Sequence, residues 1–143
     1  MNPERMRAVA DAIEESGRFH YAAWGARTTE DGAIDECISS TKDLREHGTL
    51  RHCGTTGCIA GWAATLALEL PKPLPVQWRK DMMISDIAQE YLGLDHDEAQ
   101  MLFLGQAMVY AGFYEHDGEA LAKGTAIEAA KVLRMVADGE VVL

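Results

Sequence analysis

The N-terminal residues alternate between apolar and polar with the spacing of an α-helix. Asn2 can cap such a helix, and Pro3 suits its first position. Apolar residues then recur at i, i+3, i+4 and i+7, namely Met6, Val9, Ala10 and Ile13. Gly17 is a residue type that often follows the end of a helix. The pattern predicts an amphipathic helix over about residues 3–16.

The second half of the chain contains two capping boxes, in which a capping side chain is followed three positions later by an acidic residue. The pairs are Asp95 with Glu98 and Thr125 with Glu128. Apolar residues with helical spacing follow each pair. A further helix over about 81–92 is predicted before the first box. We therefore expect the C-terminal half to be helical, with one short helical turn before the last helix.

The stretch from Ile59 to Leu70 is apolar on nearly all sides, which predicts a buried central helix over about 57–70. Small side chains on one face of it, at Cys58, Gly61 and Thr65, would let another backbone segment approach closely. The expected fold class is therefore mainly α, a single compact domain over residues 1–143 with about five helices around this small-residue helix.

Two other segments predict less regular structure. Alternating aromatic residues, FHYAAW, predict a short extended or β segment near 18–24. Residues 27–50 contain two Gly turn signals around a weakly apolar patch, and we expect a surface insertion or loop with a short helix near 33–45. The final residues, EVVL, are expected to dock as a short strand.

Composition and charge exclude several classes of protein. The formal net charge is −10, with −4 over residues 1–50, +3 over 51–80 and −9 over 81–143. So acidic a chain is repelled by phosphate backbones, which argues against direct nucleic-acid binding. No apolar run approaches the roughly 18 residues of a membrane span, and the N-terminus lacks a signal-like apolar core. We expect a cytoplasmic protein without membrane contact, whose three cysteines are reduced thiols.

Residues 51–64, RHCGTTGCIAGWAA, carry the most suggestive chemistry. Thr55 or Thr56 can cap the central helix, which places Cys58 in its first turn. Helix amides there would lower the pKa of the thiol, so Cys58 is a candidate nucleophile, with His52 or His20 as the base.

Two other chemical roles fit parts of the same segment. A Gly/Thr-rich turn at a helix start can bind an anion, which makes Thr55, Thr56, Gly57 and Cys58 candidate ligand-binding residues. The lysine of a phosphate loop is missing. A metal site would draw on Cys37, His52, Cys53 and Cys58, but four residues separate Cys53 from Cys58, more than in the usual zinc-chelating turn.

The preferred interpretation needs no chemistry at this segment, and it assigns no metal and no cofactor. Cys53 and Cys58 would then be small buried side chains in a close helix crossing. Trp62 is expected to pack away from the crowded face, toward Trp24 or Trp78.

Three stretches of the chain resemble a group of small phage and bacterial proteins for which no function is established. The group carries a C-G-T-x-x-C-[IL]-A-G-[WH] core and an L-G-L-x-x-x-E-A-x-x-L-F stretch, and the resemblance covers about 53–64 and 91–103 here, after an aromatic segment at about 19–24. The resemblance implies a phage or prophage origin and brings no activity with it. It also implies that 27–50 is an enlargement.

Two functions of different classes follow from the sequence. The preferred one is a non-enzymatic interaction or regulatory protein, phage-encoded and acting on a host protein through an acidic surface, with self-association as a further option. The alternative is a small cysteine-dependent or anion-binding enzyme centred on Thr55 to Cys58.

Overall fold

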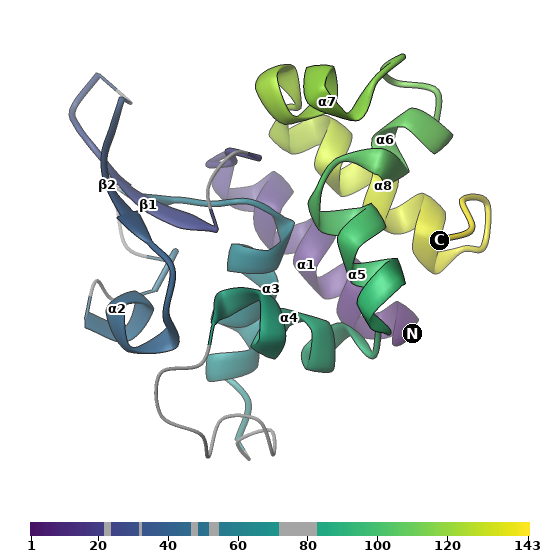
Figure 1. The fold of residues 1–143 in the computed structure, drawn as a ribbon. Coiled ribbons are helices and arrows are strands. Elements are labelled where there is room, and N and C mark those ends of the chain that lie inside the picture. The colour runs from purple at the N-terminus through teal and green to yellow at the C-terminus, as the bar shows by residue number, and fades with distance from the viewer. Residues whose placement is uncertain (22–23, 32, 47–48, 52–54, 72–82) are drawn as a thin grey trace.

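The computed structural model of the chain describes residues 1–21, 24–31, 33–46, 49–51, 55–71 and 83–143. Within them the fold is mainly α, as the sequence predicts, with eight helices and a three-stranded antiparallel sheet (Figure 1). None of the helices in these ranges is long and apolar enough to cross a membrane. In chain order the elements are α1 (Pro3–Ser16), β1 (Gly25–Thr28), β2 (Ile34–Ile38), α2 (Thr41–Glu46), β3 (Thr55–Thr56), α3 (Ile59–Leu68), α4 (Ile84–Leu92), α5 (His96–Phe103), α6 (Gln106–Tyr110), α7 (Asp117–Lys123) and α8 (Ala126–Ala137).

The capping signals in the sequence mark helix ends as predicted. Asn2 accepts a hydrogen bond from the backbone N–H of Arg5 at 3.1 Å, and Gly17 ends α1 in the left-handed conformation, with φ of 66°. Both capping boxes form, at Asp95 for α5 and at Thr125 for α8. The extra helices beyond the expected five are short ones such as α6, which Gly105 separates from α5 by its φ of 87°.

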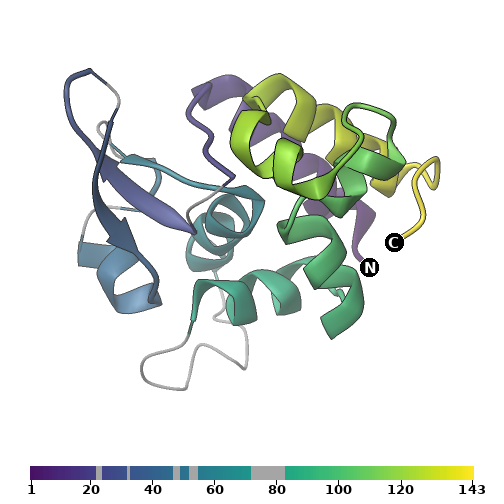
Figure 2. The same cartoon turned by 45° about the horizontal axis from the view of Figure 1, so that its top comes forward.

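The central helix α3 is enclosed by the rest of the molecule. Ile59, Ala60, Trp62, Ala63 and Ala64 have no exposed surface. Helices α1 and α4 pack against α3, while α8 packs along α1 (Figures 1 and 2). The prediction of a buried small-residue helix is therefore confirmed, with bounds of Ile59–Leu68 in place of 57–70.

Another backbone segment approaches one face of α3 closely. A Cβ added to Gly61 would lie 1.8 Å from the carbonyl oxygen of Trp24, so only glycine fits there. Further along the same face, the hydroxyl of Thr65 accepts a hydrogen bond from the backbone N–H of Leu50 at 3.3 Å. Segment 24–50 thus leaves the small-residue face of α3 at Trp24 and returns to it at Leu50.

The sheet lies beside the helices, with the strand order β2-β1-β3. Ala26 of β1 pairs with Cys37 on one side and with Thr56 on the other. In both views, β1 and β2 project from the helical body as a hairpin (Figures 1 and 2).

The strands differ in position from the prediction. A short extended or β segment was expected near 18–24; residues 18–20 lie in no strand, and the first strand, β1, begins at Gly25. The helix expected near 33–45 is wrong over its first half, because Ile34–Ile38 form β2 and α2 starts only at Thr41. Helical periodicity is weak there, so pairing with β1 decides the conformation. That 27–50 is an insertion stays a prediction.

The C-terminal residues form no strand, so that expectation is wrong as well. A turn after α8, with Gly139 at φ of 79°, leads the chain back along that helix. The N–H of Val141 donates to the carbonyl of Met135 at 3.3 Å, and its side chain is buried. One valine in the core thus replaces the expected strand pairing.

Candidate functional site

The sequence-predicted site residues lie where β3 passes into α3. Thr55 and Thr56 form β3 and pair with Arg27 and Ala26 of β1. The N-cap of α3 is Cys58 itself, in extended conformation and without a side-chain capping hydrogen bond. The expectation that a threonine caps this helix is therefore wrong, since the threonines are held in the sheet.

The Cys58 thiol is buried, with 1% of the residue exposed. Burial raises its pKa to about 11, although the backbone N–H groups of Gly61, Ala60 and Cys58 itself act in the opposite direction. The expected effect of the helix N-terminus on the thiol thus exists, but it is smaller than the cost of removing a thiolate from water. The sequence-based prediction of a lowered thiol pKa has the wrong sign.

Among the described residues, the two groups that interact with the sulfur, the Trp24 carbonyl and Tyr21, do not supply a base. The Cys58 Sγ lies 3.9 Å from the carbonyl oxygen of Trp24, to which it can donate a weak hydrogen bond. The neighbouring Tyr21 is also buried, and burial, followed by the nearby Cys58, raises its pKa above the ordinary value for a phenol. Its hydroxyl donates to the carbonyl of Leu102 at 3.3 Å. Both groups are therefore neutral at pH 7.

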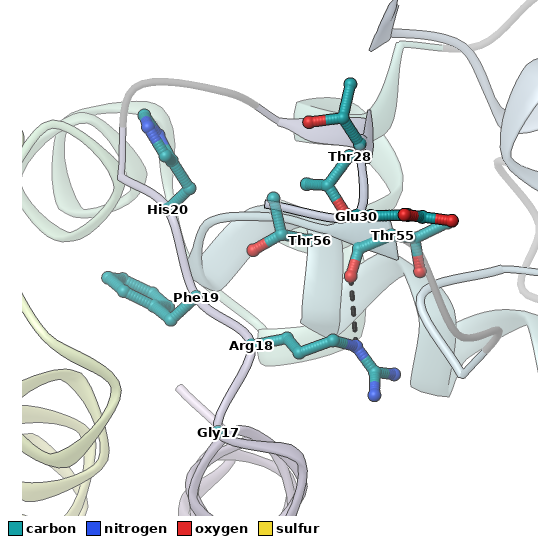
Figure 3. Close-up of a pocket in the computed structure, with 9 residues that line it drawn as sticks. Gly17, Arg18, Phe19, His20, Thr28, Glu30, Thr55 and Thr56 are labelled. Atoms are coloured by element: carbon teal, nitrogen blue, oxygen red, sulfur yellow. Dashed lines mark hydrogen bonds between the residues drawn. The ribbon is translucent and has the colours of Figure 1, made fainter. Parts of the chain in front are cut away.

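Thr55 and Thr56 line a pocket of about 430 Å³, which His20 and Arg18 also line (Figure 3). The Arg18 guanidinium donates to the carbonyl of Thr55 at 2.9 Å and to that of Leu50 at 2.7 Å. It thus ties the end of α1 to the turn before β3. These two hydrogen bonds to backbone carbonyls make Arg18 a structural bridge between the segments.

The structure joins only some of the candidate residues. His20, Thr55 and Thr56 share the pocket, whereas Cys58 does not line it. The backbone N–H of His20 donates to the carbonyl of Gly57 at 3.0 Å, and this bond holds the two segments side by side. His52 was the other candidate base, and it lies outside the described residues.

The two cysteines of the described residues differ in exposure. Cys37 is exposed on β2 and Cys58 is buried. Over the part of the chain that the structure describes, no three His, Cys, Asp or Glu side chains are grouped as metal ligands would be. His52 and Cys53 belong to the metal hypothesis and lie outside the described residues.

Two of the three tryptophans, Trp24 and Trp62, lie in the described part of the chain, and the expected packing of Trp62 toward Trp24 or Trp78 stays a prediction. Trp62 has no exposed surface, and its indole N–H donates to the carbonyl of Arg18 at 2.8 Å. Trp24 makes an edge contact with Phe103, with ring centroids 6.2 Å apart. Trp78 is outside the described residues. The indole N–H of Trp62 needs a partner inside the core, and the backbone after α1 provides it.

The projecting hairpin is a feature that the sequence reasoning missed. Its four carboxylates, Glu30, Asp31, Asp35 and Glu36, are all exposed. Arg27 is its one cationic residue among the described positions, and it pairs with Glu36 across the strands at 3.6 Å. The acidic residues were visible in the sequence, but only the β1–β2 pairing gathers them on one projection. We call residues 27–36 the acidic hairpin.

Comparison of the chain with protein-family models, with curated proteins and with solved structures found no match.

Proposed function

We propose that this chain is a non-enzymatic protein-interaction protein that binds a basic surface of a protein partner through the acidic hairpin. The observation that supports this most is the hairpin itself, which projects from the helices with a formal net charge of −3 over residues 27–36. A projecting acidic element can reach into a basic cleft, and its field raises the rate of encounter with a cationic surface.

The burial of Cys58 weighs against the enzyme alternative. A cysteine nucleophile must be accessible and have enough thiolate at pH 7, and a thiol with a pKa of about 11 has almost none. The anion-binding form of this alternative also loses support. Ile59 and Ala60, whose amides belong to the first turn of α3, have no exposed surface.

The proposal includes a setting for this activity. The partner is a host protein in the cytoplasm if the chain is phage-encoded, as the resemblance of its core motif implies. The acidic hairpin disfavours self-association through the same surface, because two copies would repel each other there. Direct binding to nucleic acid is disfavoured for the same reason.

Two charge variants of equal net charge test the proposal. One replaces the four hairpin carboxylates by amides (Glu30→Gln, Asp31→Asn, Asp35→Asn and Glu36→Gln). The matched control neutralises four exposed carboxylates elsewhere that form no ion pair with described residues (Glu15→Gln, Asp97→Asn, Glu115→Gln and Glu140→Gln). Each protein is immobilised and exposed to a lysate of the cells that express it.

We expect a specific protein to be retained by the wild type and by the control variant but not by the hairpin variant. Its retention should fall between about 0.1 M and 1 M salt, over which the Debye length shrinks from about 10 to 3 Å. A retained protein that the hairpin variant binds equally well would refute the assignment of the surface. Retention of no protein would refute the interaction function.

A further inference from the structure

The outer edge of the acidic hairpin is an edge strand. In the described part of the chain, β2 pairs along one side only, with β1. An antiparallel edge strand directs alternate backbone N–H and C=O groups away from its neighbour, where they are available to another strand.

Little of the described structure covers this edge. Four of the five residues of β2 are exposed, and among them the apolar Ile34 is 40% exposed. The nearest further pairing is an isolated bridge of Ser40 with Met83, beside a hydrogen bond of 3.1 Å from the Ile84 N–H to the Ser39 carbonyl. It involves residues beyond the end of β2, so no other strand of the described residues pairs with the outer edge of Ile34–Ile38.

Charge decides which strand can occupy the edge. If a second copy added its own β2, the carboxylates of Asp35 and Glu36 would face those of the other copy, which is unfavourable across strands. The existing sheet shows the favourable combination, since Arg27 of β1 lies directly opposite Glu36. A cationic strand on the other side can pair with Asp35 or Glu36 in the same way.

We propose that the open edge of β2 binds an extended segment of the partner that carries lysine or arginine, as an added strand. This inference rests on the proposed function and specifies how the acidic hairpin recognises its partner. Backbone hydrogen bonds supply the affinity, and the carboxylates select a cationic strand over a second copy or an acidic one.

Two labelled peptides of about eight residues, a typical strand length, test the proposal. Both alternate lysine with threonine, and in the second every backbone nitrogen is methylated, so that its charge is unchanged but it cannot donate to a strand. Affinity is measured by fluorescence anisotropy with the wild type, the hairpin variant and the matched control variant, and hydrogen exchange of the β2 amides is followed with the wild type.

We expect the unmethylated peptide to bind about ten-fold tighter than the methylated one, since only it can donate backbone hydrogen bonds to the carbonyls of β2. The unmethylated peptide should slow hydrogen exchange of the β2 amides. Its affinity should be lower for the hairpin variant than for the wild type, and unchanged for the matched control variant. Equal binding of both peptides, still dependent on the hairpin carboxylates, would overturn strand addition and leave the proposed function standing. Binding of neither peptide would overturn strand addition as well, and a dimer of the chain that the peptide dissociates would overturn the selection against a second copy.

Discussion

The close approach of Trp24 to α3 makes Gly61 the most sensitive position of the fold. In Gly61→Ala the new Cβ would lie 1.8 Å from the Trp24 carbonyl oxygen and 3.0 Å from Cδ1 of Leu50. A carbon and a carbonyl oxygen ordinarily approach to about 3.3 Å, so one of them must move by roughly 1.5 Å. Trp24 precedes β1, which is paired on both sides, and its ring contacts Phe103. The backbone there has little freedom to retreat.

The expected loss of stability follows from that displacement. Adding a methyl group to a packed core usually costs about 1–3 kcal/mol through strain. Since the clash at Gly61 is with backbone that leads directly into a strand paired on both sides, we expect Gly61→Ala to lower the free energy of unfolding by about 3 kcal/mol or more. Against a typical total of about 5–15 kcal/mol, this is a large fraction.

Gly118 provides the matched control. It lies in α7, its φ is not in the left-handed region, and an added Cβ would meet no atom within 4 Å. Gly118→Ala should therefore raise the free energy of unfolding by up to about 1 kcal/mol, because alanine is the better helix former. Urea unfolding followed by circular dichroism measures both variants. A loss below about 1 kcal/mol for Gly61→Ala would refute the close backbone contact.

Three further predictions concern single side chains. In a Cys37→Ser, Cys53→Ser variant, Cys58 should react with iodoacetamide at pH 8 only when the protein unfolds; rapid labelling of the native protein would contradict the enclosed, raised-pKa thiol. Thr65→Val removes the acceptor of the buried Leu50 N–H and should cost about 1–3 kcal/mol. Hydrogen exchange at Leu50 should rise accordingly, and unchanged exchange would count against this anchor. Burial tends to raise the pKa of Glu128, but hydrogen bonds from Tyr114 and Thr125 outweigh it and the pKa is lowered from 4.5. A lowered carboxyl pKa stabilises the fold above pH 4.5 and this stabilisation is lost as the pH falls through the folded-state value. The stability difference between wild type and Glu128→Gln should therefore shrink from pH 6 to pH 3; a constant difference in urea unfolding would refute this linkage.

Local signals in the sequence were sufficient to predict most of the helices. Asn2, Gly17 and the two capping boxes act within a few residues, so they mark helix ends without reference to the rest of the chain. The face formed by Cys58, Gly61 and Thr65 could also be predicted, because helical spacing alone places these residues together.

The strands and the acidic hairpin could not be predicted in the same way. Ile34–Ile38 become a strand because β1 lies beside them, and that pairing is a tertiary contact. The thiol of Cys58 is a similar case. Its helix position predicts a low pKa, whereas its burial raises the pKa, and burial involves residues distant in sequence such as Trp24. The chemistry of that residue is therefore a property of the packing.

The residues that look most chemical in the sequence have a mechanical explanation that connects them to the proposed function. The carbonyl oxygen of Trp24 lies against Gly61 and near the thiol of Cys58. The backbone N–H of Leu50 donates to the hydroxyl of Thr65, and its carbonyl accepts from the guanidinium of Arg18. The segment between these two anchors carries the acidic hairpin and α2. Larger side chains at Gly61 or Cys58 would push the base of the hairpin away from α3. The small-residue motif is thus what mounts the acidic hairpin on the core, and its size requirement accounts for the motif without any reaction at the thiol.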